Sequence, residues 1–160
     1  MKEFKTADLY DEHTAEVQVA EPLFRHFGGR RTFCGPIATL KVFEDNLLVH
    51  EQLKESGEGR VLVIDGGGSL RSALVGDVLA QRAKDMGYAG CVINGCVRDV
   101  ADCAKIEVGL MALAANPTRP KKKGFGERGV PVAFGGVKFT PGDWLYADDD
   151  GILVCARKLA

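Results

Sequence analysis

The chain has 160 residues, a length that fits one domain over residues 1–160. A domain of this size buries roughly 70% of the surface that its unfolded chain exposes, so it needs no disulfides or structural metal to fold. It carries 21 basic and 22 acidic residues, and this balance argues against a strongly basic face and against direct binding of nucleic acid. The five cysteines include no Cys-x-x-Cys pair, which argues against a zinc cage and favours reduced thiols. The sequence shows neither a membrane-spanning apolar run nor a signal peptide, so a cytoplasmic protein is expected.

The first predicted elements alternate between helix and strand. A short amphipathic helix is expected at 6–13, and the pattern of 37–43 predicts a strand with one solvated face. A helix should follow at 47–53, because Asp45 and Asn46 can cap its first turn and glycines come after it.

The middle of the chain begins with the run VLVID at 61–65, which is apolar and β-branched and is typical of a strand buried on both faces. Three glycines at 66–68 end this strand. The pattern of 69–75 is compatible with a strand or a helix. A strand is favoured because Gly76 followed by Asp77 resembles the start of a new helix.

Four elements are expected after that point. Residues 77–87 predict a helix whose last glycine is the C-terminal cap. The run CVIN at 91–94 predicts a buried strand, and Gly95 is expected to turn the chain. A helix at 98–105 and a buried strand at 109–115 complete this part, so the alternation favours an α/β fold.

The remaining residues predict a loop followed by strands. The stretch 116–129 is rich in Pro, Lys and Gly and is longer than most loops, which makes it a candidate functional loop. Its basic run, Lys121–Lys123, is better explained as a solvated surface. The acidic run Asp148–Asp150 could bind a cation, but a hairpin turn explains it more readily.

Asp77 and the pair Arg98-Asp99 are the candidate chemical core. Each follows a glycine and an apolar segment, and each lies at the start of an expected helix. The loops at the carboxyl ends of adjacent strands converge in open α/β sheets, and ligands bind there. Residues with twenty positions between them can therefore face one pocket.

These residue types suit an anionic ligand together with a metal. Backbone N–H groups at the start of a helix, here at 77–79, bind carboxylates readily, and Gly76 would allow a close approach. Arg98 offers a planar fork for a carboxylate or keto oxygen, and Asp99 could hold a hard divalent cation. Simpler interpretations remain open, because Asp at a helix start is often only a cap and an Arg-Asp pair is often only a surface contact.

Two other activities are weaker alternatives. The run VIDGGG is similar to the glycine motif of adenosylmethionine-dependent methyltransferases, but Arg71 stands where the last glycine of the Gly-x-Gly-x-x-Gly spacing should be. A Schiff-base lysine is conceivable in an aldolase, but none of the lysines lies within a buried strand pattern.

Several motifs, in order along nearly the whole chain, resemble the A-type regulators of ribonuclease E activity and the class II 4-hydroxy-4-methyl-2-oxoglutarate aldolases of the same superfamily. They are FGGR (27–30), VFEDN (42–46), VLVIDGGGSLRSALVGD (61–77), NGCVRD (94–99), FGGVKFTPGD (134–143) and YADDDGI (146–152). The aldolase hallmark, an Asp followed after twenty residues by Arg-Asp, is matched by Asp77, Arg98 and Asp99.

The resemblance implies a compact single-domain α/β/β swivelling-type sandwich, assembled as a homotrimer or a hexamer. It implies a divalent cation, Mg²⁺ or Mn²⁺, as cofactor and a small 2-oxo acid as substrate. Asp99 would anchor the cation, and Asp77 and Arg98 would be catalytic. The residues implied to bind the pyruvyl group are Gly76, Asp77, Val78, Leu79 and Arg98.

Two functions of different classes follow from the resemblance. The first is a lyase that cleaves 4-hydroxy-4-methyl-2-oxoglutarate to pyruvate and decarboxylates oxaloacetate. The second is a protein inhibitor that binds ribonuclease E. Members of the regulator branch can lack one or both aspartates, so the presence of Asp77, Arg98 and Asp99 favours the enzyme.

Overall fold

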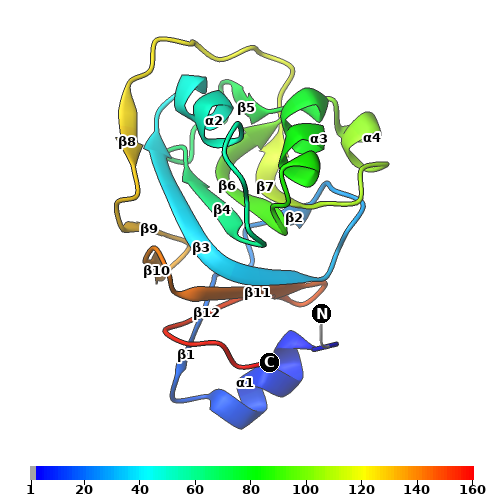
Figure 1. Ribbon diagram of the computed structural model, residues 1–160, viewed down its shortest axis with the longest axis vertical. Coiled ribbons are helices and arrows are strands. Elements are labelled where there is room, and N and C mark those ends of the chain that lie inside the picture. Colours follow the sequence, from blue (N-terminus) through cyan, green and yellow to red (C-terminus); the bar gives the residue numbers. More distant parts are fainter. Residues whose placement is uncertain (1–2) are drawn as a thin grey trace.

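The computed structural model describes residues 3–160 and consists of layers (Figure 1). Its helices are α1 Thr6–His13, α2 Leu47–Gln52, α3 Asp77–Asp85 and α4 Val100–Cys103. Its strands are β1 Val17–Val19, β2 Arg25–His26, β3 Phe33–Val42, β4 Val61–Asp65, β5 Ala73–Val75, β6 Gly90–Val97, β7 Gly109–Ala115, β8 Gly126–Arg128, β9 Val132–Phe134, β10 Val137–Phe139, β11 Trp144–Asp148 and β12 Gly151–Cys155. None of the helices within residues 3–160 combines the length and the apolar character that a membrane crossing requires.

The long strand β3 joins two sheet layers. Its first residues pair antiparallel with β11, and its later residues pair parallel with β4. The strand order is β1-β12-β11-β3-β4-β6-β7-β2, with β3, β4, β6 and β7 parallel and the β1-β12-β11 side antiparallel. In Figure 1, β3 curves from the lower antiparallel layer into the parallel layer, which carries α2 and α3 on its outer face.

Apolar side chains fill the space on both sides of the parallel layer, because each of its strands is buried on both faces. On one side, Leu62, Ile64 and Ile93 pack beneath the helices, and on the other, Val61 and Val63 pack against the antiparallel layer. This arrangement explains why β4 consists of apolar residues rather than alternating ones. The layers follow the order helix, sheet, sheet, and this confirms the expected α/β/β sandwich.

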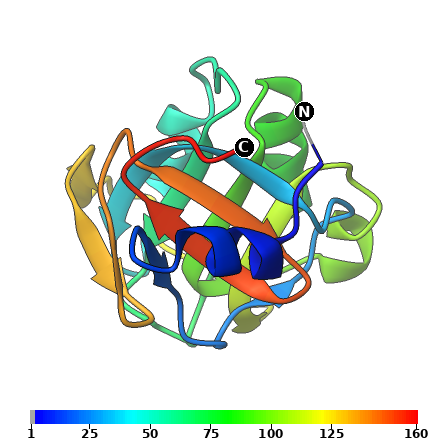
Figure 2. The ribbon, with the colours of Figure 1, turned by 90° about the horizontal axis from the view of Figure 1, so that it is seen from below.

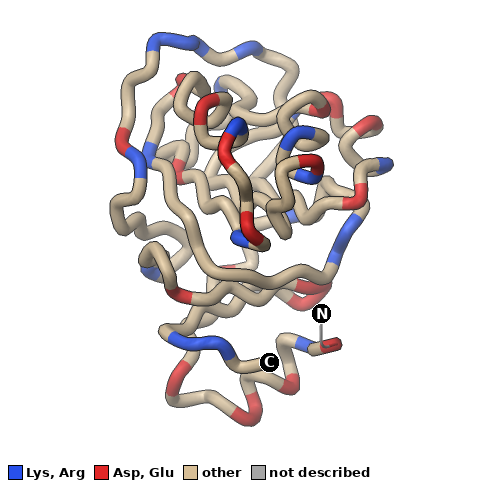
Figure 3. The backbone as a smooth tube through the Cα atoms, in the orientation of Figure 1, with Lys and Arg blue, Asp and Glu red and all other residues tan. Residues whose placement is uncertain are grey.

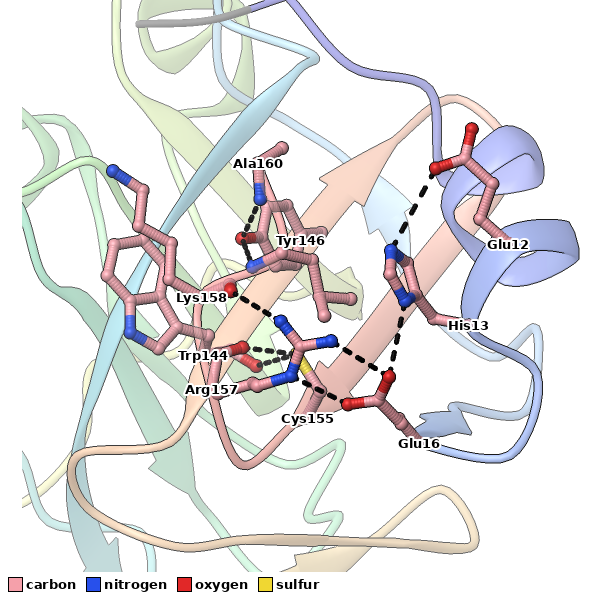
Figure 4. Close-up of polar contacts among 10 residues, drawn as sticks. Glu12, His13, Glu16, Trp144, Tyr146, Cys155, Arg157, Lys158 and Ala160 are labelled. Atoms are coloured by element: carbon pink, nitrogen blue, oxygen red, sulfur yellow. Dashed lines mark hydrogen bonds and ion pairs between the residues drawn. The ribbon is translucent and has the colours of Figure 1, made fainter.

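Helix α1 covers the outer face of the antiparallel layer (Figure 2). A third apolar cluster fills this contact, where the ring of Phe4 lies 5.1 Å from the ring of Tyr146 in an edge-on arrangement. The Tyr146 hydroxyl accepts the N–H groups of Leu159 and Ala160 at 2.7 and 3.1 Å, which holds the C-terminal residues against the sheet (Figure 4). Nearby, Arg157 binds both carboxylate oxygens of Glu16.

Most predicted elements are confirmed. The helices at 6–13 and 47–53 and the strands at 61–65 and 109–115 are present within a residue of the expected bounds. The Asp148–Asp150 run is a hairpin turn, since Asp148 pairs with Gly151 across β11 and β12. The lysines of the 121–123 run are exposed, as expected of a solvated loop.

Several details of the prediction are wrong. Gly95 does not turn the chain, because β6 continues through it to Val97. The strand at 69–75 shrinks to β5 and the helix at 98–105 to α4, since turn geometry occupies the other residues. The strand at 37–43 is solvated only at its end, because Ile37 and Thr39 are each 2% exposed, whereas Lys41 is exposed.

Candidate functional site

A pocket of about 290 Å³ lies where α2, β5, α3 and the segment after β6 meet the loop that follows β7. The pocket is lined by Asn46, His50, Ala73, Leu74, Gly76, Asp77, Val78, Leu79, Arg98, Asp99, Arg119, Pro120 and Lys122. All six residues that the sequence indicated as a site are therefore brought to one pocket. Strand β5 makes this possible, because it pairs parallel with the end of β6 and places Gly76 beside Arg98 and Asp99.

The close approach at Gly76 leaves no room for a side chain. A Cβ atom at this position would lie 2.6 Å from Oδ2 of Asp99 and 3.2 Å from Cγ of Arg98. The backbone of Gly76 is extended, with φ −121°, so its conformation does not demand glycine. The requirement is steric, and it comes from the two side chains that fill the space over Gly76.

Backbone contacts hold the Arg98–Asp99 segment at the pocket wall. The N–H group of Arg98 donates to the carbonyl oxygen of Val75 at 3.0 Å, and the thiol of Cys103 donates to the carbonyl of Arg98 at 3.5 Å. Asp99 adopts the left-handed conformation, with φ 55° and ψ 40°, which Asp and Asn tolerate better than other residues with a side chain.

The carboxylate of Asp99 does not cap the helix that follows it. Asp99 occupies the N-cap position of α4, but its side chain makes no capping hydrogen bond. Its Oδ2 lies 3.6 Å from Nε of Arg98, and about a third of each side chain is exposed. The simple capping interpretation of Asp99 is therefore wrong, and the pair faces the pocket with its polar atoms accessible.

The start of α3 presents both a carboxylate and backbone N–H groups. Asp77 is the first residue of the helix, and its Oδ1 accepts the N–H of Val78 at 2.9 Å. Of the three N–H groups expected to be free, that of Val78 is therefore already engaged. The side chain of Leu79 is 3% exposed and packs in the core, so only its backbone can contact a ligand.

Cys103, beneath the site, is not a nucleophile. Burial, followed by the carboxylates of Asp77, Asp99 and Asp102, raises the pKa of its thiol to about 11. The thiol therefore stays protonated near neutral pH and cannot act as a thiolate. The chemistry of the pocket rests on its carboxylates and cations.

Helix α2 contributes two residues that the sequence analysis did not assign to the site. Asn46 is 6% exposed, and its amide nitrogen donates to the carbonyl of Leu74 at 3.0 Å, while its Oδ1 has no donor among residues 3–160. His50 is half-buried, and burial, then Lys122, Arg82 and Lys54, lower its pKa. His50 is therefore neutral at pH 7.

The loop between β7 and β8, residues 116–125, crosses over the pocket, and we call it the strap. It arches above α2 and β5 in Figure 1, and its basic residues form the blue segments at the top of Figure 3. Arg119, Pro120 and Lys122 of the strap line the pocket. The length of the 116–129 loop predicted a functional role, whereas its basic run, Lys121–Lys123, was predicted to be a solvated surface.

The donor set at the pocket is small. Within residues 3–160 no group of three or more His, Cys, Asp or Glu side chains is placed to hold a metal ion. Asp77 and Asp99 supply two carboxylates at the pocket wall. Such a set fits a hard cation of the Mg²⁺ type, which keeps several waters and is bound through one or two carboxylates.

The glycine turn at 66–68 belongs to a different part of the molecule. It leads into β5 rather than into a helix, whereas a cofactor-binding glycine turn opens a helix whose N-terminus holds the ligand. Gly67 lines a separate pocket, together with Phe43 and Phe125. The methyltransferase interpretation therefore lacks both the glycine spacing and the helix.

Comparison with known proteins places the chain in a family. The model of the RraA-like family, described as Aldolase/RraA, matches residues 6–154. A relative from Alkalilimnicola ehrlichii is 54% identical over 154 residues, covering 96% of both chains, and carries the provisional name 4-hydroxy-4-methyl-2-oxoglutarate aldolase.

Two solved structures share the fold closely. One, from Geobacillus kaustophilus, is named S-adenosylmethionine: 2-dimethylmenaquinone methyltransferase. It is 50% identical, with a TM-score of 0.96 over 98% of this chain and 97% of that one. The other is the RNA-processing inhibitor RraA from Thermus thermophilis. It is 46% identical, with a TM-score of 0.95 over 99% of this chain and 96% of that one.

Proposed function

The chain belongs to the RraA-like family, and from this premise we propose that it is a divalent-metal-dependent lyase. Its reactions would be the retro-aldol cleavage of 4-hydroxy-4-methyl-2-oxoglutarate to pyruvate and the decarboxylation of oxaloacetate. The observation that carries the proposal is the meeting of Asp77, Arg98 and Asp99 around one pocket, where the lack of a side chain at Gly76 leaves room for the Arg98 and Asp99 side chains. The aldolase names of relatives more than 50% identical support the same reaction class.

The pyruvyl end of the substrate would bind between α3 and Arg98. The start of α3 carries the partial positive charge of the helix and N–H groups without intrahelical partners, which suit the substrate carboxylate. The guanidinium of Arg98 would donate to the keto oxygen. Its backbone bond to Val75 holds it at the pocket wall before substrate arrives.

Both reactions leave the same product fragment, the enolate of pyruvate. In the retro-aldol reaction the 4-hydroxyl loses its proton, the C3–C4 bond breaks, and its electron pair becomes the enolate. In decarboxylation the bond to CO₂ breaks in the same way. Arg98 would stabilise the enolate oxygen as its charge develops. Asp77 would accept the hydroxyl proton through a water and return a proton to the enolate carbon.

We propose a divalent cation because the two carboxylates at the pocket wall, those of Asp77 and Asp99, suit such an ion. Asp99 would hold a Mg²⁺ or Mn²⁺ ion, and Asp77 would contact its water shell. Lewis-acid stabilisation of the enolate charge is the chemistry that such a bound cation supplies. Arg98 would keep the Asp99 carboxylate oriented toward the pocket, since the two side chains lie 3.6 Å apart.

Metal removal tests the proposed function directly. We expect the protein to release pyruvate from oxaloacetate and from 4-hydroxy-4-methyl-2-oxoglutarate with added magnesium, and to fall to the uncatalysed rate in excess EDTA. Adding magnesium or manganese back in excess over the chelator should restore the rate. Pyruvate formation can be followed with a coupled dehydrogenase assay. Full activity in EDTA would refute the metal-dependent mechanism.

A substitution at Gly76 tests the geometry of the pocket. In Gly76→Ala the new methyl group would meet Asp99 at 2.6 Å, so the carboxylate must move. The extended backbone accepts alanine, and we expect the melting temperature to change little while kcat/KM for oxaloacetate falls by roughly 100-fold, as misplacement of about 1 Å can cause. Unchanged kcat/KM would show that the approach of Gly76 to Asp99 is irrelevant to the reaction.

A second function is favoured by one specific comparison. The chain is 46% identical to an RNA-processing inhibitor, and the two folds superpose over nearly their whole length. We therefore propose inhibition of ribonuclease E by direct contact as the alternative activity. This function would use the outer surface rather than the pocket, because affinity between proteins comes from a few well-packed surface residues.

The assembly and location are proposals of the same kind. The family resemblance implies a homotrimer or a hexamer of this chain. The thiols of Cys91, Cys96, Cys103 and Cys155 form no disulfide, which suits the reducing cytoplasm.

A further inference from the structure

A different pocket, of about 460 Å³, lies where β3 passes from its antiparallel partner β11 to its parallel partner β4. Arg60, just before β4, and Arg128 of β8 line it, and we call it the arginine pocket. It shares no residue with the pocket around Asp77 and Arg98. We propose that the arginine pocket binds a small organic carboxylate with an apolar body, held at its charged end by Arg60 and Arg128.

The first observation is that both guanidinium groups are fixed along one edge and keep a free nitrogen. Nε and Nη2 of Arg60 donate to the carbonyl oxygens of Gly57 and Ser56 at 3.0 and 2.9 Å. Nε and Nη2 of Arg128 donate to Oε1 of Gln52 at 3.1 and 2.8 Å. Within residues 3–160, Nη1 of neither arginine has an acceptor. Each Nη1 can therefore donate to a carboxylate while the existing hydrogen bonds remain.

One buried pair of side chains supports both arginines. Gln52 and Tyr88 are buried, and Nε2 of Gln52 donates to the Tyr88 hydroxyl at 3.1 Å. That hydroxyl donates to the backbone carbonyl of Gln52 at 3.0 Å, and the amide Oε1 remains to accept from Arg128. Cζ of Arg60 lies 5.8 Å from the centroid of the Tyr88 ring. Because both cationic side chains are held before a ligand arrives, binding has less ordering entropy to overcome.

The second observation is that the arginine pocket has an excess of one positive charge. Its charged residues are Arg60, Arg128 and Glu55. Oε1 of Glu55 accepts from Nη2 of Arg128 at 2.7 Å, so this pair is nearly balanced. In the described part of the chain Arg60 forms no ion pair. One carboxylate would balance the pocket, whereas a phosphate monoester, with a charge of about −1.5 to −2, would exceed the balance.

The third observation is the apolar character of the rest of the wall. Ile37 and Ala38 of β3 line the arginine pocket and are buried, and Pro36 and Pro141 line it as well. Apolar walls with a few polar groups are typical of small-molecule sites, and the volume lies in their usual range of about 300–1,000 Å³. A bare anion would leave this apolar surface uncovered. The ligand that fits is therefore a carboxylate that carries a short hydrocarbon chain or ring.

The test uses hexanoate and hexanamide, which have nearly the same shape and differ in charge. Calorimetry with the full chain should show that hexanoate binds at least about tenfold more tightly than hexanamide, as expected of charge-assisted hydrogen bonds. Hexyl phosphate should bind no more tightly than hexanoate. Equal affinity for hexanoate and hexanamide, or no binding of hexanoate, would overturn the inference. Tighter binding of hexyl phosphate would overturn the assignment to a carboxylate.

Nuclear magnetic resonance can locate the bound hexanoate. The backbone amide signals of Arg60, Gly129 and Gly142, all in the wall of the arginine pocket, should shift and saturate as hexanoate is added. Shifts confined to Gly76 and Val78 would place the probe in the other pocket and would contradict the proposal.

Two variants change the charge of the arginine pocket in opposite directions. In Arg128→Gln the affinity for hexanoate should fall at least about tenfold. In Glu55→Gln it should rise, because the opposing charge is gone while the amide oxygen can still accept from Arg128. The Glu55 side chain is more than half exposed, so this variant should keep the parent melting temperature even if the loss of the donor to Gln52 destabilises Arg128→Gln. Unchanged or weaker binding of hexanoate in a folded Glu55→Gln would contradict the charge argument.

A matched control removes a positive charge beside the arginine pocket. Lys54 is exposed, adjoins Glu55 in the sequence and does not line the pocket. Lys54→Gln should therefore keep the hexanoate affinity within twofold of the parent protein. Equal loss in Lys54→Gln and Arg128→Gln would indicate a general effect of net charge and would overturn the site. These binding measurements do not depend on the proposed lyase activity, because neither pocket shares a residue with the other.

Discussion

Replacing Arg98 by lysine is expected to reduce kcat/KM for oxaloacetate by roughly 30- to 1,000-fold, which corresponds to about 2–4 kcal/mol of transition-state stabilisation. Lysine keeps the positive charge but lacks the planar fork that can hold a keto oxygen and the Asp99 carboxylate together. The backbone bond from residue 98 to Val75 does not depend on the side chain, so the fold should remain. The measurement is steady-state pyruvate release at saturating magnesium.

The control for this variant is an arginine with a similar ion pair on another surface. Arg31 lies 2.6 Å from Asp149, and both side chains are more than half exposed. Arg31→Lys should leave kcat/KM unchanged, because exposed ion pairs contribute only about 0–1 kcal/mol. If Arg98→Lys also stays within twofold of the parent protein, Arg98 is only a surface partner of Asp99 and the assignment fails.

The central part of the site was predictable because its residues follow elements with strong patterns. The strands β4, β6 and β7 are continuous apolar runs, and their carboxyl ends lie together in a parallel layer. Arg98 comes directly after β6, and Asp77 follows the short strand β5 and Gly76; β5 pairs parallel with the end of β6, so the topology brings the two residues together. The glycine before Asp77 indicated a close approach, and the structure shows which atoms approach it.

The other residues of the pocket could not be predicted, because nothing local marks them. His50 lies in the short helix α2 and Asn46 is its N-cap residue, and both reach the site because this part of the chain packs beside β5. Arg119 and Lys122 lie in a loop without periodicity. Their placement depends on long-range hydrogen bonds to Asp45, which links residues almost eighty positions apart.

The conformation of Asp99 was also hidden from sequence patterns, and it changes how its role should be tested. Asp99 has φ 55°, where a residue such as alanine is strained by roughly 1–2 kcal/mol. An alanine variant would therefore lose stability for a backbone reason unrelated to any metal. Asparagine tolerates the same conformation and keeps the size of the side chain, so Asp99→Asn removes only the charge.

We expect Asp99→Asn to lose on the order of 100-fold in oxaloacetate decarboxylation, since even residues that only support a metal ligand can cost that much. The magnesium concentration for half-maximal activity should rise, because a neutral amide is a poorer ligand for a hard cation than a carboxylate. The melting temperature should stay close to that of the parent protein, since the Asp99 side chain makes no capping hydrogen bond that the change would remove.

Binding to ribonuclease E then separates the two functions in the same variant. Asp99 lies at a pocket wall, and its substitution leaves the outer surface of the sheets and of α1 unchanged. Binding of the parent protein that survives in Asp99→Asn, together with lost decarboxylation, would place the two activities on different parts of the molecule. No binding by the parent protein would remove the regulator function. Unchanged decarboxylation with an unchanged magnesium requirement would show that Asp99 does not hold the cation.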